Sequence, residues 1–194
     1  MNFNHNIILE NNTALLRPLM HRDEEGFSKI AFDADIWKFF TARILDLEEL
    51  NKFIKTSLED RERNFRYPFT IIQKASGEIA GSTSFGNVSI KDKRIEIGWT
   101  WLGKKFMGTG LNKECKFLLL QYAFEHLKFE RVELKTDVLN KASRRAMEKI
   151  GAKEEGILRS HTLMHDGRRR DTIYYSILAN EWTNLKNTIF NNYE

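Results

Sequence analysis

The chain has 194 residues, 41% of them hydrophobic, and its 31 basic and 27 acidic side chains give a net charge of +4. This length predicts one domain over residues 1–194 with enough apolar side chains for a core. No run approaches the ~20 apolar residues of a membrane helix, and Met1–Glu10 lacks the pattern of a signal peptide. A single cysteine, Cys115, excludes an internal disulfide and a cysteine-rich zinc site. We therefore expect a soluble, cytoplasmic protein.

The first part of the chain alternates short strands with helices. Residues 46–63 carry Leu47, Leu50, Ile54 and Leu58 at helical spacing, which predicts a long helix. The other elements expected here are strands at 7–10 and 14–19 around an Asn11-Asn12 turn, a helix at 23–32, and strands at 67–74 and 78–90 around a Ser76-Gly77 turn.

Residues 94–102 alternate between apolar and other side chains, as a strand does. The pattern places Ile95, Ile97, Trp99 and Trp101 on one face, and Glu96, Gly98 and Thr100 on the other.

The second part of the chain contains a strand–helix–strand crossover. Asn140 is a suitable N-cap for a helix that ends at Gly151. The other elements expected are a helix at 110–127, a strand at 131–138, strands at 153–164 and 169–178 around an Asp166-Gly167 turn, and a helix at 181–186. This order predicts an α/β sheet with antiparallel pairs and one parallel pair.

The segment Lys105-Phe106-Met107-Gly108-Thr109-Gly110 lies between a predicted strand and a predicted helix. Unpaired N–H groups at a helix start, beside glycines that allow close approach, can hold a pyrophosphate. Lys104, Lys105 and Lys113 add positive charge. Two glycines alone are a weak signal and favour a tight strand-to-helix turn without a ligand, and the segment is neither a Walker loop nor a dinucleotide fingerprint.

In its wider context this segment resembles the Q/R-x-x-G-x-G/A signature of the GNAT acetyltransferases. Gly108 and Gly110 match, and Glu96–Leu102 looks like the family's fourth strand. Asn140, Ser143, Lys149 and Gly151 resemble its fourth-helix pattern. The closing strand, with Arg170-Asp171-Thr172 and Tyr175-Ser176-Ile177-Leu178, is similar to that of the bacterial ribosomal-protein N-terminal acetyltransferases.

The resemblance implies a twisted, mostly antiparallel mixed sheet of about seven strands flanked by helices, with the cofactor cleft between the fourth and fifth strands. Two positions depart from the family. Lys105 stands where Gln or Arg is usual, and Met147 stands where many relatives carry a proton-donating Tyr.

The implied reaction is direct transfer from acetyl-CoA to a primary amine. Glu96 is the candidate general base, acting directly or through water; pairing with Arg131 or Lys135 is an equal alternative. Backbone N–H groups around Trp101 and Leu102 would stabilise the oxyanion if the fourth and fifth strands part there.

Ser143 is the candidate acid for the departing thiolate, with a purely binding role as the alternative. Asn140 would bond the pantetheine arm, and Arg144 and Lys141 would meet phosphates or stay solvated. The implied cofactor-binding residues are Trp101, Leu102, Lys105, Phe106, Met107, Gly108, Thr109, Gly110, Leu111, Asn140, Ser143 and Arg144.

Four other features are interpreted structurally. His161 and His165 fall in a predicted strand and turn, so no metal site is expected. Cys115 shares a helix face with Leu111, Leu118 and Tyr122, which indicates a core thiol. Arg168-Arg169-Arg170 favours a solvated hairpin tip over an RNA contact. Trp37, Phe39 and Phe40 fit an acceptor pocket or the core equally.

Two functions follow. The first is an N-acetyltransferase acting on a protein N-terminus or a small amine, without metal, membrane or nucleic acid, and with strand edges that allow a homodimer. The second is a non-catalytic module that senses acyl-CoA or binds RNA; the intact loop, Glu96 and Ser143 argue against it.

Overall fold

A computed structural model describes residues 5–193. Its strands form one sheet in the order β1-β2-β3-β4-β5-β6-β8-β7, in which β5 and β6 are parallel and all other neighbours are antiparallel. The strands are β1 (Leu9–Glu10), β2 (Ala14–Pro18), β3 (Arg66–Gln73), β4 (Glu78–Ser89), β5 (Arg94–Leu102), β6 (Arg131–Asp137), β7 (Lys153–Leu163) and β8 (Arg169–Leu178).

The helices are α1 (Glu24–Ser28), α2 (Ala34–Trp37), α3 (Leu47–Glu62), α4 (Leu111–Gln121), α5 (Lys141–Glu148) and α6 (Ala179–Thr188). Short 3-10 turns η1 (His21–Asp23) and η2 (Lys104–Phe106) precede α1 and α4, and a π-helical turn η3 (Tyr122–His126) continues α4. No helix within residues 5–193 is long and apolar enough to cross a membrane.

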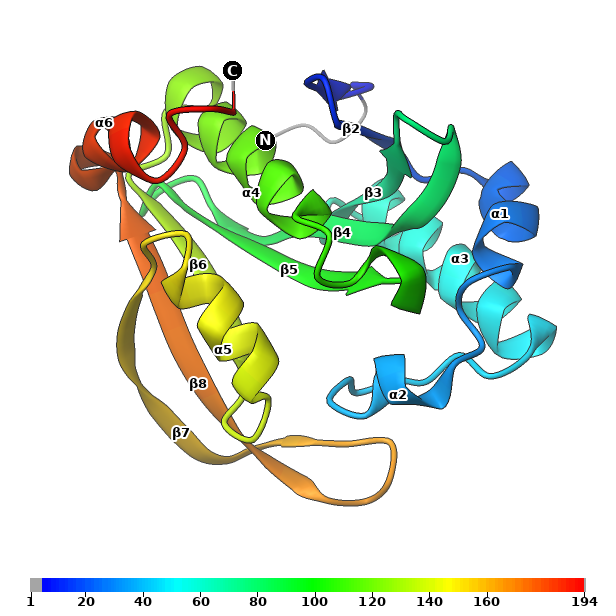
Figure 1. Cartoon of the computed structure of the whole chain (residues 1–194). Coiled ribbons are helices and arrows are strands. Elements are labelled where there is room, and N and C mark those ends of the chain that lie inside the picture. The colour runs from blue at the N-terminus through cyan, green and yellow to red at the C-terminus, as the bar shows by residue number, and fades with distance from the viewer. Residues whose placement is uncertain (1–4, 194) are drawn as a thin grey trace.

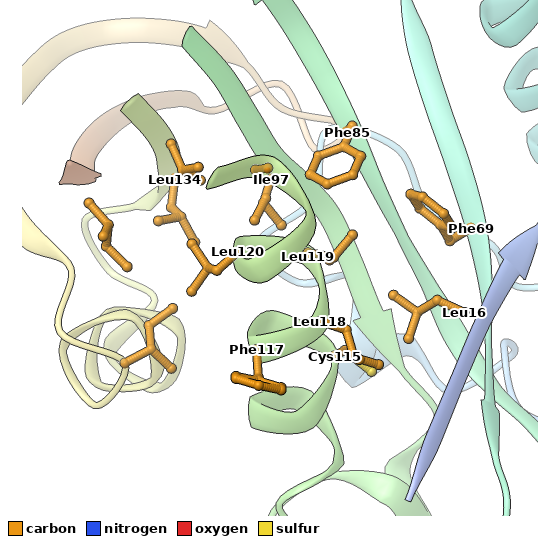
Figure 2. Packing of buried hydrophobic residues seen from close by; sticks show 14 of the residues in the cluster. Leu16, Phe69, Phe85, Ile97, Cys115, Phe117, Leu118, Leu119, Leu120 and Leu134 are labelled. Atoms are coloured by element: carbon orange, nitrogen blue, oxygen red, sulfur yellow. The ribbon is translucent and has the colours of Figure 1, made fainter. Parts of the chain in front are cut away.

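The sheet has two differently covered faces (Figure 1). On the α4 face, the core combines sheet residues such as Phe69, Phe85 and Leu134 with side chains of α4, α5 and α6. On the α3 face, Trp101 packs with side chains of α1, α2 and α3. Figure 2 shows the α4 face, where Cys115, Leu118 and Leu119 lie between the helix and the strands.

Most of the expected elements are present. The mixed sheet with one parallel pair is confirmed, with eight strands where about seven were expected. The family's fourth and fifth strands are β5 and β6. The helix expected at 110–127 is α4 with its π-helical end, and the Asn140 side chain caps α5 by accepting a hydrogen bond from Ser143 N. Helix α2 was not predicted, and residues 1–4 and 194 of the expected domain lie outside the described residues.

The expected alternation along β5 is wrong beyond Gly98. Ser84 pairs with Gly98 and Ser82 with Trp101, so Trp99 and Thr100 oppose the single residue Thr83. This is a β-bulge, and Trp99 adopts φ +51° within it. Ile95 and Ile97 face α4, whereas Trp101 belongs to the core of the α3 face. An extra residue reverses the alternation, which a simple period of two cannot show.

The Trp99 ring is held from two sides, which explains how a bulky residue keeps a positive φ. The Arg66 guanidinium lies 5.3 Å from the ring centroid. The ring also occupies the space above Gly86, where a Cβ would come within 2.5 Å of it. The bulge therefore rests on packing with β3 and β4.

Candidate active site

Strands β5 and β6 part soon after they begin. They pair only at Arg94–Arg131, Ile95–Val132 and Glu96–Glu133, although β5 continues to Leu102 and β6 to Asp137. The bulge in β5 lies just beyond this point, and bulges bend a strand and increase its twist. Beyond Glu96 and Glu133, the facing edges of the two strands consequently have no ladder partner among residues 5–193. We call this separation of β5 from β6 the splay; it is the break in pairing that stabilisation of an oxyanion by β5 N–H groups requires.

On the α4 face, the loop before α4 presents free backbone donors. Gly108 and Gly110 adopt φ +76° and +91°, and a Cβ at either position would meet nothing within 4 Å. The N–H groups of Gly108, Thr109, Gly110 and Asn112 have no acceptor within residues 5–193. The Thr109 hydroxyl steadies the loop by donating to the Phe106 carbonyl at 2.8 Å. These donors stand at the positive end of an eleven-residue helix, an arrangement that attracts anions.

The lysines near this loop are bound elsewhere. Lys105 Nζ lies 2.6 Å from Glu78 Oε1, and Lys104 Nζ lies 3.2 Å from Asp33. Lys113 Nζ donates to the Ile189 carbonyl at 2.9 Å and sits over the Tyr193 ring. Phe106 is buried in the core and Met107 is exposed. The free backbone N–H groups, and not the lysine side chains, are thus the donors that the loop can offer to a ligand.

Helix α5 begins on the same face of the sheet, directly after β6. Asn140 Oδ1 accepts from Ser143 N at 3.0 Å, and the Ser143 hydroxyl bonds to no residue in the described part of the chain. Arg144 turns toward β8 and β7, where Nε is 3.2 Å from the Tyr175 hydroxyl and Nη2 is 3.4 Å from Glu154. Met147 packs in the core and supplies no proton donor.

Glu96 lies on the opposite, α3 face and is 2% exposed. Its Oε2 atom is 2.8 Å from Lys135 Nζ and accepts a 2.6 Å hydrogen bond from Asn87. Its Oε1 atom has no hydrogen-bond partner in residues 5–193 and points along β5 to Gly98, where a Cβ would stand 2.7 Å away. The pairing with Lys135 is therefore present, yet it leaves one carboxylate oxygen free at the start of the splay.

A pocket of about 540 Å³ opens beside Glu96 on the α3 face. Its lining residues are Asn64, Phe65, Asn87, Val88, Arg94, Glu96, Glu133, Lys135 and Tyr174. The nearby Ser84 hydroxyl and Trp101 Nε1 are buried polar atoms without a hydrogen-bond partner among the described residues. Buried polar groups normally have partners, so this side of the splay is expected to hold water or part of a ligand.

The aromatic residues of α2 and of the turn that follows it differ in burial. Trp37 is buried against Trp101, with ring centroids 5.1 Å apart, and the half-buried Phe40 ring lies 5.3 Å from that of Trp37. Phe39 is half-buried beside Lys38. His165 Nε2 approaches the Trp37 carbonyl at 3.3 Å, so the β7–β8 turn meets α2 across the mouth of the splay. The core interpretation holds for Trp37.

The remaining features that the sequence singled out have structural surroundings. Within residues 5–193, no three His, Cys, Asp or Glu side chains gather as a metal site. Cys115 is a buried core residue, and burial raises the pKa of its thiol to about 12. The solvated-tip interpretation fits Arg169, which is exposed, but is wrong for Arg170, which is buried.

Lys116 is a site residue that sequence reasoning missed. It is buried on α4, and its Nζ donates to Thr100 Oγ1 at 2.8 Å. Thr100 in turn shares a 2.7 Å hydrogen bond with Thr83. Burial lowers the pKa of Lys116 to about 8. The sequence gives no signal of this burial, because Lys113 and Glu114 lie close by and make Lys116 look like a further exposed charge.

Known proteins share this architecture. A family model described as an acetyltransferase (GNAT) domain matches residues 14–153. A putative ribosomal N-acetyltransferase of Bacillus subtilis, YdaF, is 37% identical over 110 residues, which cover 57% of this chain and 59% of that protein. An uncharacterised N-acetyltransferase of the same organism, YoaA, is 25% identical over 88% of this chain and 96% of its own length.

Solved structures extend the likeness to nearly the whole chain. A putative acetyltransferase from T. thermophilus has a TM-score of 0.87 at 32% identity and covers 96% of this chain and 97% of its own. A ribosomal L7/L12 α-N-protein acetyltransferase, RimL, shares the fold with a TM-score of 0.78 at 20% identity, covering 90% and 96% of the two chains. With its family-model match over more than half its length, the chain belongs to the GNAT acetyltransferase family.

Proposed function

We propose that the protein transfers the acetyl group of acetyl-CoA to a primary amine, by direct attack while both substrates are bound. The observation that carries this proposal is the splay between β5 and β6, with free loop N–H groups on its α4 face and a free Glu96 oxygen on its α3 face. One side suits an anionic cofactor and the other suits an amine.

The cofactor would bind from the α4 face. GNAT acetyltransferases use acetyl-CoA, whose pyrophosphate fits the N–H groups of Gly108, Thr109 and Gly110. Lys105, Phe106, Met107 and Leu111 complete the loop around them. Across the splay, Asn140 and Ser143 at the start of α5 would contact the pantetheine arm. Arg144 would reach the cofactor only by leaving Tyr175 and Glu154, so we assign it the smallest share of binding.

The amine must lose a proton before it attacks. At pH 7 this costs about 1.4 kcal/mol for an α-amino group of pKa about 8, and about 4.6 kcal/mol for a lysine of pKa about 10.4. Glu96 Oε1 is placed to take that proton, directly or through water, while Lys135 and Asn87 hold Oε2 in position. A weak base of this kind favours α-amines as acceptors.

Attack by the amine nitrogen on the thioester carbonyl carbon forms a C–N bond and places negative charge on the carbonyl oxygen. Backbone N–H groups of β5 near Trp101 and Leu102, which have no partner strand on the β6 side, would stabilise that charge. The carbonyl then re-forms, the C–S bond breaks, and the attacking nitrogen releases its second proton to water. The thiolate takes a proton from the Ser143 hydroxyl, which water can reprotonate, because Met147 cannot donate one.

The test is amine-dependent release of free CoA thiol, measured with a panel of small amines and peptide N-termini. We expect Glu96→Gln to lower kcat by about 10² or more with little change in the KM for acetyl-CoA. Glu130→Gln is the control, because Glu130 is an exposed glutamate paired with Lys93. A folded wild-type protein that releases no thiol with any amine would overturn the proposal and favour a binding module.

A further inference from the structure

Arg170 is a buried cation with little to bind. It is 8% exposed, and its Nε donates to Thr172 Oγ1 at 3.0 Å. Its two terminal nitrogens make no hydrogen bond or ion pair with any residue in 5–193. A guanidinium taken out of water without a partner is unfavourable, and arginines that are this buried are normally paired.

The acidic side chains nearby already have partners. Arg168 Nη2 lies 2.5 Å from Asp137 Oδ2, and Lys135 holds Glu96 Oε2. Asp137 and Glu96 favour the charged form of Arg170, but burial is the larger effect and lowers its pKa. Lys135 thus pairs with Glu96 and Arg168 pairs with Asp137, and no carboxylate within residues 5–193 forms an ion pair with Arg170.

Arg170 lies on the face of β8 that borders the pocket beside Glu96. Along β8 it shares the α3 face with Thr172 and Tyr174, and Tyr174 lines that pocket. Its hydrogen bond to Thr172 Oγ1 holds the guanidinium on the Tyr174 side of Arg170. The Glu96 carboxylate is close enough to act electrostatically on it. An acceptor could thus reach both groups from one binding position.

We propose that Arg170 binds a carboxylate of the acceptor while the amine of the same molecule lies at Glu96 Oε1. The inference rests on the proposed function and narrows its substrate class to amines that carry a carboxylate. A guanidinium offers two parallel N–H donors that match the two oxygens of a carboxylate. The carboxylate can come from a free amino acid or from an acidic side chain near a peptide N-terminus, and the experiment separates these two sources.

The experiment compares acceptors that differ only in that group. One pair is alanine and alaninamide; the other is an amidated Ser-Asp-Ala peptide and its Ser-Asn-Ala counterpart. For each acceptor, kcat/KM is measured for the wild type, Arg170→Gln, Arg170→Lys and the control Arg169→Gln. Arg169 is a matched control because it is exposed and bonds only to Ser160. Comparing variants with the same acceptor removes differences in amine basicity.

We expect Arg170→Gln to lower kcat/KM about tenfold to a hundredfold for the carboxylate acceptor of at least one pair, and to change its uncharged counterpart by less than about twofold. Arg170→Lys should recover part of the loss, and Arg169→Gln should behave as wild type. The pair that responds identifies the source of the carboxylate. Equal losses on both members of each pair, or no loss on any, would overturn the assignment of Arg170 and leave acetyl transfer itself intact.

A binding measurement covers the case in which no acceptor turns over. Thermal shifts of the wild type with the two carboxylate acceptors should exceed those with their uncharged counterparts, and Arg170→Gln should lose the excess. Melting curves without ligand show whether each variant is folded. The absence of any carboxylate-specific shift in the wild type would also overturn the proposal.

Discussion

Lys116 allows the electrostatics of the core to be tested by one substitution, Lys116→Met. Burial lowers the pKa of this ammonium from 10.5 to about 8, while the charges of Cys115 and Glu96 act in the opposite direction. A shift of about 2.5 units corresponds to about 3 kcal/mol against the charged form, at 1.36 kcal/mol per unit. Methionine fits the same space without charge, and Thr100 and Thr83 remain bonded to each other.

The direction in which stability changes with pH follows from proton binding. Between about pH 8 and 10.5 the unfolded chain binds more protons at Lys116 than the folded chain, so wild-type stability should rise with pH there. The stability of Lys116→Met should not show this rise with pH. At pH 7 the variant should be more stable by about 2 to 3 kcal/mol, or roughly 5 to 10 °C in Tm for a chain of this size, and the advantage should shrink as pH approaches 10.

The assay is urea unfolding of both proteins at pH 7, 8.5 and 10, with Lys52→Met as a control for loss of an exposed lysine. A Lys116→Met protein that is less stable than wild type at pH 7 would refute the reasoning. So would a difference between the two proteins that does not change with pH. The first result would mean that the hydrogen bond to Thr100 outweighs the burial of the charge, and the second that folding leaves the pKa of Lys116 unchanged.

Three further predictions concern single side chains. Gly98→Ala should lower kcat about tenfold to a hundredfold, because the alanine Cβ would displace Glu96 Oε1, and it should leave the thermal shift by acetyl-CoA unchanged. An unchanged kcat would contradict the assignment of Glu96 Oε1 as the base. Cys115 should resist thiol reagents at pH 8 in the native protein and react in urea, since burial raises its pKa to about 12; rapid native labelling would show that the thiol is accessible. Ser143→Ala should lower kcat about tenfold or more at constant KM for acetyl-CoA if the hydroxyl is the acid, and kcat should be unchanged if it only binds.

The sequence predicted best what depends on local chemistry. Asn140 caps α5, and Gly167 adopts φ +84° in the β7–β8 turn, because each position favours a small set of residue types that can be recognised in the sequence. The pairing of Glu96 with Lys135 was foreseen as an alternative, since both side chains lie on neighbouring strands. The family signature likewise located the loop with Gly108 and Gly110, whose positive φ angles favour glycine.

Features set by tertiary contacts could not be predicted in the same way. The bulge at Trp99 depends on packing against Arg66 and Gly86, and the residues of β5 alternate without any sign of it. The extent of β5–β6 pairing is a property of two twisted strands together. Arg170 was interpreted as part of an exposed hairpin tip because it follows two other arginines. Its burial depends on which face of β8 it occupies and on how the hairpin packs, and the run of arginines shows neither.

Every step of the proposed reaction requires that the loop before α4 bind acetyl-CoA through its backbone. The most direct test is a thermal shift with acetyl-CoA on the wild type, Gly108→Glu and Gly77→Glu. Gly77 is a matched control because it also has a positive φ and open space at its Cβ, in the turn between β3 and β4. A ligand at about 100 times its Kd should stabilise the wild type and Gly77→Glu by about 2.7 kcal/mol, and Gly108→Glu should not respond. Equal shifts in all three proteins would place the cofactor elsewhere, and no shift in a folded wild type at millimolar acetyl-CoA would show that the protein does not bind the cofactor.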